Sequence, residues 1–504
     1  MILSSILTDL TYTYHKDTDF FNTIEIEDIL YNSLKCRNNT IFVAIKGETS
    51  DGHKYVSSAY SKGCRVFVLQ DDVYLPDDTI KIFVKDSRIA LSKMSSNFFN
   101  NPSKELIVIG ITGTKGKTTI TNYISTVLNN SGINTGIIGT NGAFFNGIKE
   151  STVNTTPESY ELNRILRKMV DSGIKCVAME VSSGGLMMNR VKDIDFDIAL
   201  FSNIAPDHIG PKEHPTFEHY LNSKIQLFKL AKFGIINADA DFAQTVIENA
   251  TCPTYTFSID KPSDLQADNI EYSNSLDRLG VSFNYNTKES SFPCYICAPG
   301  TFSIYNALSV IAVCIHLGIE YKSIINSLKN VDVDGRVQVL PILPYATVIV
   351  DYAHNGISLD NIVTTLKQYK PKRLICVFGS IGDKSKLRRK ELGDIAAKEC
   401  DLCILTSDNP GNEDPMKIIS DIEKSFANSR CMYIKEPDRE KAVRQAIRLA
   451  EEGDIILLAG KGHEKHQLIN GEKIPFDEVE IAKDEAKKVL IKEKIYAFNV
   501  ETCR

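Results

Sequence analysis

The sequence predicts an α/β protein of three domains, and three observations support this fold class. The chain has 504 residues, which corresponds to about three domains of ordinary size. From Glu105 onward, apolar strand-like runs alternate with turns and helical patterns, as in parallel sheets with crossover helices. A glycine-rich turn at 110–119 follows one such strand and opens a helix, which is typical of phosphate-binding loops.

The bulk composition excludes several classes of protein. The chain is 43% hydrophobic and 24% charged, as is ordinary for a globular protein. Its formal net charge of −6 argues against nucleic-acid binding, which normally requires a basic excess. No apolar run approaches the roughly 20 residues that span a bilayer, and the N-terminus lacks the pattern of a signal peptide. The 12 cysteines are interpreted as reduced thiols. We expect a cytoplasmic protein without membrane insertion, and we expect it to be a monomer.

The first domain is predicted over residues 1–104, as a smaller N-terminal α/β domain. Short β-rich runs are followed by a helical stretch and a linker. The runs span 41–45, 64–69 and 80–84, the helix 88–100 and the linker 101–104.

The central domain is predicted over residues 105–335. Its apolar strands span 106–109, 176–179, 198–201 and 234–236. Their alternation with helical stretches indicates a parallel sheet. A more polar, alternating section at 269–299 predicts an antiparallel addition before a helix at 304–317.

The C-terminal domain, residues 336–504, is predicted to be a second, Rossmann-like α/β series. Its strands span 346–350, 373–378, 402–405 and 454–458. Each strand runs directly into a polar or glycine-rich cluster, at 351–354, 379–382, 407–410 and 460–463. Because open parallel sheets bind ligands at the carboxyl ends of their strands, these clusters predict a ligand cleft. The charged tail at 483–494 is interpreted as a solvated helix.

The glycine-rich turn has the chemistry of a nucleotide phosphate site. Its glycines allow backbone N–H groups to face phosphate oxygens, and the helix N-terminus adds positive potential. Lys117 can reach the β- and γ-phosphates, and the Thr118 hydroxyl can ligate Mg²⁺. Ile111 occupies the position of the first glycine of the strict phosphate-loop motif. We see no NKxD string for guanine, so the pattern favours a nucleotide-binding protein other than a GTPase.

Read as Gly113-Thr114-Lys115-Gly116-Lys117-Thr118, the turn resembles the phosphate loop of the Mur ligase family. Other motifs of the family follow in order along nearly the whole chain. They are Phe-Val-Ala-Ile-Lys-Gly at 42–47, Asn-Thr-Thr-Pro at 154–157, Glu-Val-Ser-Ser at 180–183, Asp-His at 207–208, the segment 220–224, Asp-Gly-Arg at 334–336, Asp-Tyr-Ala-His at 351–354, Ser-Asp-Asn-Pro at 407–410 and Gly-Lys-Gly-His-Glu at 460–464. The resemblance implies a UDP-sugar-binding N-terminal domain, an ATP-binding central domain and an amino-acid-binding C-terminal domain.

The pattern is most similar to the members that add the third residue of the peptidoglycan peptide. The resemblance implies that ATP phosphorylates the D-glutamyl side-chain carboxylate of UDP-N-acetylmuramoyl-L-alanyl-D-glutamate. The amine of a diamino acid then attacks the acyl phosphate, and ADP and phosphate leave. Because the triphosphate and the carboxylate are both anions, a divalent cation and cationic side chains are needed to bring them together.

The resemblance also implies a role for each candidate site residue. The catalytic residues are Lys117, Glu180, His208 and Lys224. The Mg²⁺ ligands are Thr118, Glu180, His208 and Lys224, the lysine in carbamylated form. The ATP contacts are Gly113, Thr114, Lys115, Gly116, Lys117, Thr118, Thr119, Asn306, Arg336 and His354. The UDP-dipeptide contacts are Ser33, Thr155, Thr156, Ser183 and Arg190, and the amino-acid contacts are Arg389, Asp408, Asn409, Gly460 and Glu464.

Four positions depart from the family pattern. Leu34 stands where an arginine is expected, which puts the UDP contacts there in question. Gly184 replaces a histidine, Gly210 an aspartate and Ser303 an asparagine. None of these departures removes the phosphate loop or the metal residues.

The acceptor amino acid is predicted from the loop after the Ser-Asp-Asn-Pro motif. Members that select meso-diaminopimelate have an arginine at the position of Gly411, and losing its charge-assisted hydrogen bond costs about 1.5–3 kcal/mol. Acidic Glu413 and Asp414 would suit a distal ammonium. We therefore expect L-lysine as the acceptor, with meso-diaminopimelate as the alternative.

Two further functions are alternatives. A folylpolyglutamate-synthetase-like ligase would share the fold and the acyl-phosphate chemistry, but the motifs at 42–47 and 154–157 favour a UDP-muramoyl substrate. A non-catalytic, nucleotide-binding regulator of cell-wall synthesis would bind ATP without turnover.

Overall fold

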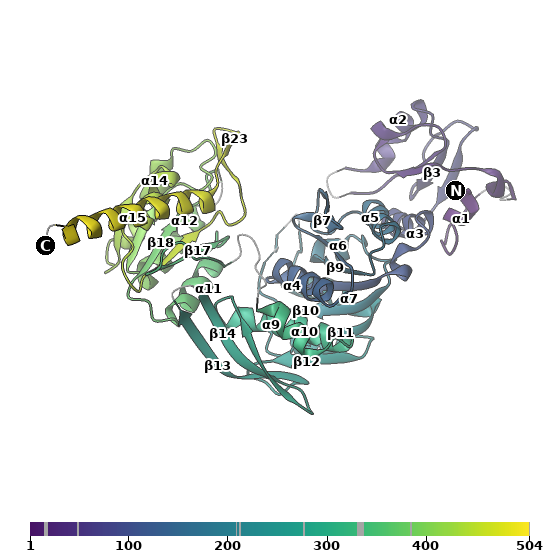
Figure 1. Ribbon diagram of the computed structural model, residues 1–504. Helices are drawn as coiled ribbons and strands as arrows, with labels where there is room; N and C mark the ends of the chain where they lie inside the picture. Colours follow the sequence, from purple (N-terminus) through teal and green to yellow (C-terminus); the bar gives the residue numbers. More distant parts are fainter. Residues whose placement is uncertain are drawn as a thin grey trace. The chain divides into compact units, whose positions relative to one another are not determined.

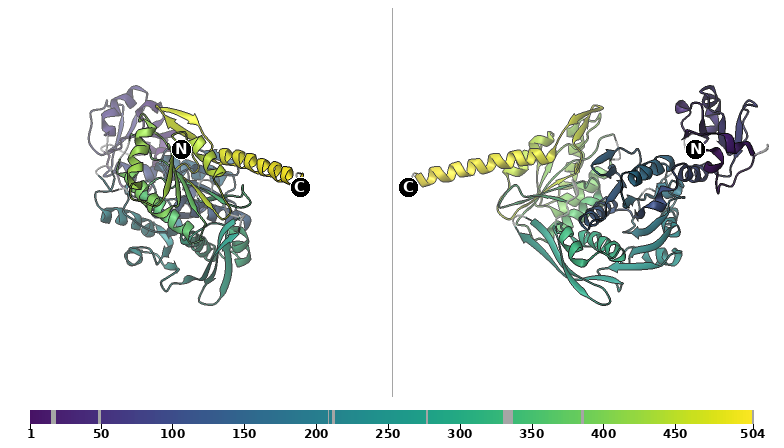
Figure 2. Two further views of the ribbon diagram at one scale, coloured as in Figure 1. Left: turned by 90° about the vertical axis from the view of Figure 1, so that its left-hand side faces the viewer. Right: turned by 45° about the vertical axis from the view of Figure 1, so that its right-hand side comes forward.

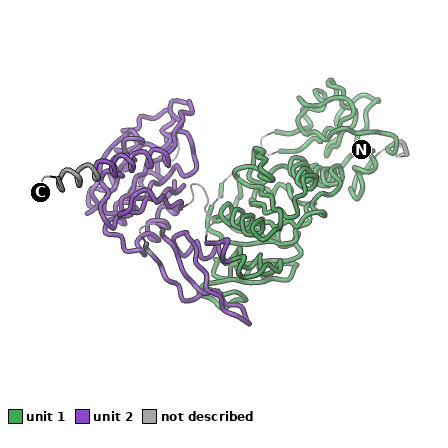
Figure 3. The backbone as a smooth tube through the Cα atoms, viewed as in Figure 1, with its two compact units in different colours: residues 1–266, 308–324 green, residues 267–307, 325–504 purple. Residues whose placement is uncertain are grey.

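The chain forms two compact units, which Figure 3 shows in different colours. Unit 1 comprises Met1–Gln266 and Leu308–Ile324, and unit 2 comprises Ala267–Ala307 and Ile325–Arg504. The structure is a computed structural model, and it describes residues 1–14, 19–47, 50–207, 209–210, 213–275, 278–329, 337–383 and 386–502.

A four-stranded parallel sheet forms the N-terminal part of unit 1 (Figure 1). Its strands, in sheet order, are β1 (Asp28–Leu30), β2 (Thr40–Val43), β3 (Val66–Leu69) and β4 (Ile80–Phe83). The helices are α1 (Leu3–Ile6), α2 (Val56–Ser61) and α3 (Ser87–Phe98). The Asp86 carboxylate accepts hydrogen bonds from the N–H groups of Arg88 and Ile89, which fixes the start of α3. The predicted linker at 101–104 overlaps a 3-10 helix, Pro102–Glu105, and the fixed φ of Pro102 suits the first turn of that helix.

The larger sheet of unit 1 carries the phosphate loop. Its parallel strands, in sheet order, are β12 (Thr254–Ser258), β11 (Ala231–Asn237), β10 (Phe196–Phe201), β5 (Ile107–Thr112), β9 (Cys176–Glu180) and β6 (Thr135–Gly139). Antiparallel β7 (Gly142–Phe145) and β8 (Ile148–Glu150) follow β6 in the sheet. The helices are α4 (Lys117–Asn130), α5 (Ser159–Asp171), α6 (Ser183–Met187), α7 (Phe217–Leu230) and α8 (Ala243–Asn249). Strands β5, β9 and β10 are largely buried on both faces, which explains their continuous apolar runs.

The C-terminal part of unit 2 is built on a six-stranded sheet. Its strands, in sheet order, are β16 (Gln338–Leu340), β17 (Thr347–Asp351), β21 (Ile455–Ala459), β18 (Leu374–Phe378), β19 (Leu402–Leu405) and β20 (Met432–Lys435). Only the pairing of β16 with β17 is antiparallel among these described strands. The helices are α11 (Gly356–Lys367), α12 (Leu387–Glu399), α13 (Pro415–Glu423), α14 (Arg439–Arg448) and α15 (Glu478–Thr502), of which α14 and α15 lie side by side (Figure 1).

The polar section before residue 300 forms the predicted additional strands. They are β13 (Leu265–Ser275), which begins in unit 1, β14 (Arg278–Asn286) and β15 (Ser291–Ile296). Figure 2 shows β13 and β14 as long neighbouring strands, and β14 pairs with β15 in antiparallel register. Helices α9 (Thr301–His316) and α10 (Tyr321–Leu328) follow and have residues in both units.

The α/β fold class is therefore confirmed, while several elements were not predicted. These include α1, α2, β1, β6, β7, β8, β12, β16, β20 and the antiparallel hairpin of β22 (His466–Ile469) and β23 (Glu472–Pro475). The predicted domain junction at 334–336 lies outside the described residues. Among the described helices, none has both the length and the apolar character needed to cross a membrane.

Candidate active site

The phosphate loop connects β5 to α4. Gly113 (φ 152°) and Gly116 (φ 86°) have positive φ angles, which glycine adopts without steric cost. A Cβ atom at Gly113 would lie 2.1 Å from the Ser202 Oγ, so a larger residue would not fit. The N–H of Lys115 donates to the Oδ1 of Asn203 at 2.9 Å. The segment after β10 thus supports the loop.

Two lysine side chains converge on one carbonyl oxygen of this loop. Lys117 donates from Nζ to the Gly113 carbonyl at 2.9 Å and to the Thr114 carbonyl at 3.2 Å. Lys224, on α7 and only 2% exposed, donates to the same Gly113 oxygen at 2.9 Å. Burial and the nearby Lys117 charge lower the pKa of Lys224 well below its ordinary value, although Asp207 acts in the opposite direction. At a given pH, a larger fraction of Lys224 is therefore in the neutral amine form than of an exposed lysine.

Glu180, at the end of β9, connects the phosphate loop to the neighbouring strand. Its carboxylate is 2% exposed and its Oε1 accepts hydrogen bonds from the Thr118 hydroxyl and the Thr140 N–H, both at 3.0 Å. The Thr140 hydroxyl donates to Oε2 at 3.2 Å. Gly139 leaves room for this carboxylate, because a Cβ atom there would lie 2.3 Å from Oε1. Thr140 was not predicted, since it lies outside the motifs of the family pattern and its backbone N–H carries no sequence signal.

The Thr118 and Glu180 oxygens fit a Mg²⁺ site. Mg²⁺ prefers oxygen ligands in octahedral geometry, in which neighbouring ligand oxygens lie about 2.9 Å apart. The observed separation of 3.0 Å between Thr118 Oγ1 and Glu180 Oε1 matches that value. Of the four predicted ligands, Thr118 and Glu180 are therefore in contact. Lys224 donates a hydrogen bond to the same phosphate loop, and His208 lies outside the described residues.

Two of the predicted UDP-dipeptide contacts lie next to Glu180. The Thr155 hydroxyl is 3.2 Å from the Thr140 hydroxyl. The Thr156 hydroxyl donates to the backbone carbonyl of Glu180 at 3.0 Å and accepts from the N–H of Ser182 at 2.9 Å. These contacts place both threonines beside the candidate metal site.

Arg190 and Ser183 lie in the same part of unit 1 but already have protein partners. Arg190 donates from Nε to Glu158 at 2.8 Å and from a guanidinium nitrogen to the Thr156 carbonyl at 3.1 Å. Ser183 Oγ lies 2.9 Å from the Nε2 of His214, which sequence reasoning did not select. A substrate anion at Arg190 would share the guanidinium with Glu158.

Three of the four positions that depart from the family pattern have open surroundings among the described residues. Leu34 is 72% exposed on the 3-10 helix Ser33–Lys35, next to buried Ser33. Around Gly184 and Gly210, no described heavy atom lies within 4 Å of where a Cβ atom would be. Among the described residues, nothing therefore blocks a larger side chain at either glycine.

In unit 2, the predicted amino-acid contacts gather at the ends of β19 and β21. The amide of Asn409 donates from Nδ2 to the Oε2 of Glu464 at 3.1 Å. Gly460 lies beside Asp408, because a Cβ atom at Gly460 would be 3.4 Å from the Asp408 Oδ2. Lys461, which was not predicted, donates to both Asn409 and Glu464. Four predicted residues thus meet around one buried lysine.

Arg389, the fifth predicted amino-acid contact, is held by two carboxylates. It is 1% exposed, and one of its terminal nitrogens lies 2.8 Å from each carboxylate oxygen of Glu413. The other donates to Asp421 at 3.1 Å. Hydrogen bonding to Arg389 is the main cause that lowers the pKa of Glu413. A substrate carboxylate at Arg389 would therefore compete with Glu413.

The remaining predicted nucleotide contacts are more dispersed. Thr119 lies in the first turn of α4 and Asn306 in the second turn of α9. His354 donates from Nδ1 to the Tyr352 carbonyl at 2.8 Å. Arg336 lies outside the described residues.

Comparison with known proteins gives a match along most of the chain. Residues 25–111 match the Mur ligase family catalytic domain, 111–314 the Mur ligase middle domain and 335–462 the Mur ligase glutamate ligase domain. The chain belongs to the Mur ligase family. It is accordingly an ATP-dependent enzyme that forms amide bonds, with the three-domain α/β fold of that family.

Individual relatives match over their whole length. The chain is 38% identical over 492 residues to the UDP-N-acetylmuramoyl-L-alanyl-D-glutamate–2,6-diaminopimelate ligase of Clostridium perfringens, covering 96% of this chain and 99% of the relative. The ligase of the same name from Clostridium botulinum is 39% identical over 497 residues, covering 97% and 100%. A solved structure of a ligase with that name has a TM-score of 0.73 at 25% identity, covering 95% of this chain and 99% of that one.

Proposed function

We propose that this Mur ligase couples a diamino acid to UDP-N-acetylmuramoyl-L-alanyl-D-glutamate, adding the third residue of the peptidoglycan peptide. The observation that carries the proposal is the full-length similarity to ligases named for that substrate. We further propose that the enzyme acts as a monomer in the cytoplasm, where its nucleotide substrates are available.

In the proposed first step, the phosphate loop binds ATP. Lys117 exchanges its two loop carbonyls for phosphate oxygens, since a charge-assisted hydrogen bond is stronger than one to a neutral carbonyl. Thr118, Glu180 and His208 would hold Mg²⁺, which offsets the negative charge of the reacting groups. The neutral amine of Lys224 is suited to react with CO₂, forming an N–C bond and releasing a proton. The resulting carbamate would add an oxygen ligand beside Gly113.

In the following steps, the D-glutamyl carboxylate becomes the acyl group. One of its oxygens bonds to the γ-phosphorus of ATP while the bond to ADP breaks. The amine of the acceptor then forms a bond to the carbonyl carbon, the carbon–oxygen bond to phosphate breaks, and the amine loses a proton. Thr155 and Thr156 support placing the dipeptide near Glu180, because Thr155 contacts the Thr140 hydroxyl and Thr156 contacts the backbone carbonyl of Glu180.

For the acceptor, we propose 2,6-diaminopimelate. The expectation of L-lysine is not supported, because the relatives at 38–39% identity are named for 2,6-diaminopimelate. L-Lysine remains a second candidate because of Gly411. This residue has φ 61°, and a Cβ atom there would lie 2.3 Å from the Asp383 Oδ2, so an arginine does not fit this loop conformation. A distal carboxylate must therefore be bound by another group.

The proposal is tested by supplying the enzyme with ATP, Mg²⁺, the UDP-dipeptide and one acceptor at a time. ADP formation and the mass of the UDP-tripeptide are followed with 2,6-diaminopimelate, L-lysine and L-ornithine. We expect a product with 2,6-diaminopimelate. A product with L-lysine alone would show that L-lysine, the second candidate, is the acceptor. ATP binding without any product would support a non-catalytic regulator.

A further inference from the structure

We propose that Lys461 is a positioning residue that holds Asn409 and Glu464 in the arrangement that receives the acceptor amino acid. The inference rests on the proposed function and assigns a role to a side chain of the Gly-Lys-Gly-His-Glu motif at 460–464 for which none was predicted. Lys461 directly follows Gly460 at the end of β21, and its side chain is fully buried.

The Lys461 ammonium is held by neighbouring side chains of the protein. Its Nζ donates to the Asn409 Oδ1 at 2.8 Å and to the Glu464 Oε2 at 2.7 Å. The Asp408 Oδ1 lies 3.6 Å away as a third anionic neighbour. Two of the three N–H donors of the ammonium are thus used in hydrogen bonds, and Asp408 is an ion-pair neighbour beyond hydrogen-bond distance. Because the side chain is fully buried and its hydrogen bonds go to Asn409 and Glu464, Lys461 acts on the site through these residues.

The contacts of Lys461 fix the orientation of the Asn409 amide. Asn409 Oδ1 accepts from Lys461 and also from the N–H of Leu468 at 2.9 Å. With Oδ1 committed to two donors, the amide nitrogen Nδ2 must point the other way, where it donates to Glu464 at 3.1 Å. A flipped amide would place Nδ2 against the ammonium, so the lysine permits one orientation only.

Lys461 also determines the charge and position of Glu464. Burial alone would raise the pKa of Glu464, but the hydrogen bond and charge of Lys461, with Asn409 and Tyr352, outweigh burial and lower it. Tyr352 donates to the Oε1 at 3.2 Å while Lys461 and Asn409 hold Oε2. Glu464 is thereby kept as a carboxylate, the form that accepts hydrogen bonds from an ammonium group.

The role of Lys461 is confined to the acceptor side of the reaction. Removing one partner of a buried ion pair leaves the other charge uncompensated, so loss of Lys461 would disturb Glu464 and Asp408 directly. The phosphate loop and the proposed UDP-dipeptide contacts lie in unit 1, while the predicted ATP contacts Asn306 and His354 belong to unit 2 and do not contact Lys461 through any hydrogen bond described above. A defect at Lys461 should therefore appear in the KM of the acceptor and spare the KM values of ATP and the UDP-dipeptide.

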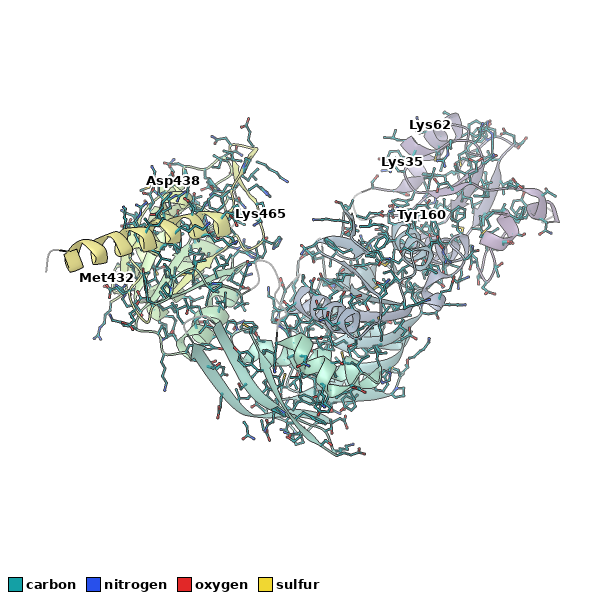
Figure 4. The ribbon with its side chains drawn as sticks, in the orientation of Figure 1. Lys35, Lys62, Tyr160, Met432, Asp438 and Lys465 are labelled. Atoms are coloured by element: carbon teal, nitrogen blue, oxygen red, sulfur yellow. The ribbon has the colours of Figure 1, made fainter. Side chains whose placement is uncertain are left out.

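The test compares Lys461→Met with the matched control Lys465→Met in steady-state assays on the full chain. Lys465, labelled in Figure 4, has a side chain that is 60% exposed and pairs with Asp477 at 2.9 Å. For Lys461→Met we expect the KM for 2,6-diaminopimelate to rise at least tenfold, with the other two KM values within about twofold of wild type. The control should leave all three unchanged.

A double variant tests whether Lys461 acts through Glu464. If it does, Lys461→Met combined with Glu464→Gln should raise the acceptor KM no further than Glu464→Gln alone. Independent, multiplicative effects, or a rise in the KM of ATP equal to that of the acceptor, would overturn the positioning role. If Lys461→Met fails to fold, Lys461→Arg, which keeps the charge but alters the distances, is judged by the same comparison of KM values.

The wild-type enzyme separates failure of this inference from failure of the proposed function. A wild type that turns over no acceptor would refute both. A wild type that turns over 2,6-diaminopimelate, with a Lys461→Met variant whose acceptor KM stays within twofold, would refute the positioning role alone.

Discussion

The candidate Mg²⁺ site can be tested with a substitution that changes none of its proposed ligands. Gly139→Ala adds a single methyl group whose carbon would lie 2.3 Å from Glu180 Oε1. Ordinary contact begins at 3.4 Å, so the carboxylate must move by about 1 Å (3.4 − 2.3 = 1.1). That shift breaks the 3.0 Å contact between Glu180 and the Thr118 hydroxyl. The backbone of Gly139 does not have a positive φ, so alanine introduces no backbone strain there.

A displacement of this size should reduce catalysis strongly. Misplacing a catalytic group by 1 Å can cost about 10²-fold in rate, which corresponds to about 2.7 kcal/mol. For Gly139→Ala we therefore expect kcat to fall by about 10²-fold and the Mg²⁺ concentration for half-maximal rate to rise. Overpacking should lower stability by about 1–3 kcal/mol, which a domain of this size tolerates.

The assay is phosphate release as a function of Mg²⁺ concentration, with thermal unfolding measured in parallel. Gly184→Ala is the control, because no described heavy atom lies within 4 Å of where its Cβ would be. If folded Gly139→Ala enzyme had the wild-type kcat and Mg²⁺ dependence, Glu180 would not hold the cation in the position described here.

Three further predictions concern single residues. Lys117→Ala should lower kcat/KM by at least 10²-fold, the cost of removing one charge-stabilising donor, and near-normal phosphate release would refute the assignment of the phosphate loop. Gly411→Arg should lower the free energy of unfolding in urea by about 1–3 kcal/mol because of its positive φ, whereas unchanged stability with faster use of 2,6-diaminopimelate would contradict the account of Asp383. The pKa of buried Lys224 in the folded protein is lowered below its ordinary 10.5. At pH values between the folded and the unfolded pKa of this lysine, the unfolded chain therefore binds more protons than the folded protein, and stability rises with pH. In CO₂-free buffer, the stability of wild type relative to Lys224→Met should therefore increase from about pH 8 to about pH 10, and a difference that stays constant would contradict the lowered pKa.

The sequence predicted the fold well where parallel strands are buried on both faces. Strand β18 is fully buried and appears in the sequence as an unbroken apolar run. Strand β6 was missed because two of its five residues are glycines, which weaken the strand signal. The 3-10 helix at Pro102–Glu105 is too short to have a periodic pattern.

The sequence predicted side chains at strand ends better than it predicted the groups that support them. The family resemblance selected the phosphate loop and Glu180 separately, and the pairing of Ile111 with Glu180 across β5 and β9 places both at the same edge of the sheet. Thr140 contributes a backbone N–H and a hydroxyl from a loop outside the predicted motifs, and Lys461 is a buried cation within a glycine-rich motif. The contact of Thr140 with Glu180 and that of Lys461 with Asn409 do not follow from residue spacing, because each joins loops that are distant in the sequence.

The central claim is that the D-glutamyl carboxylate is activated by transfer of the γ-phosphoryl group of ATP. The most direct test uses the UDP-dipeptide with ¹⁸O in both oxygens of that carboxylate, together with ATP, Mg²⁺ and 2,6-diaminopimelate. The account predicts one ¹⁸O atom in each released phosphate and one in the new amide of a diaminopimelate-containing product. Unlabelled phosphate, or labelled dipeptide recovered without product, would contradict it.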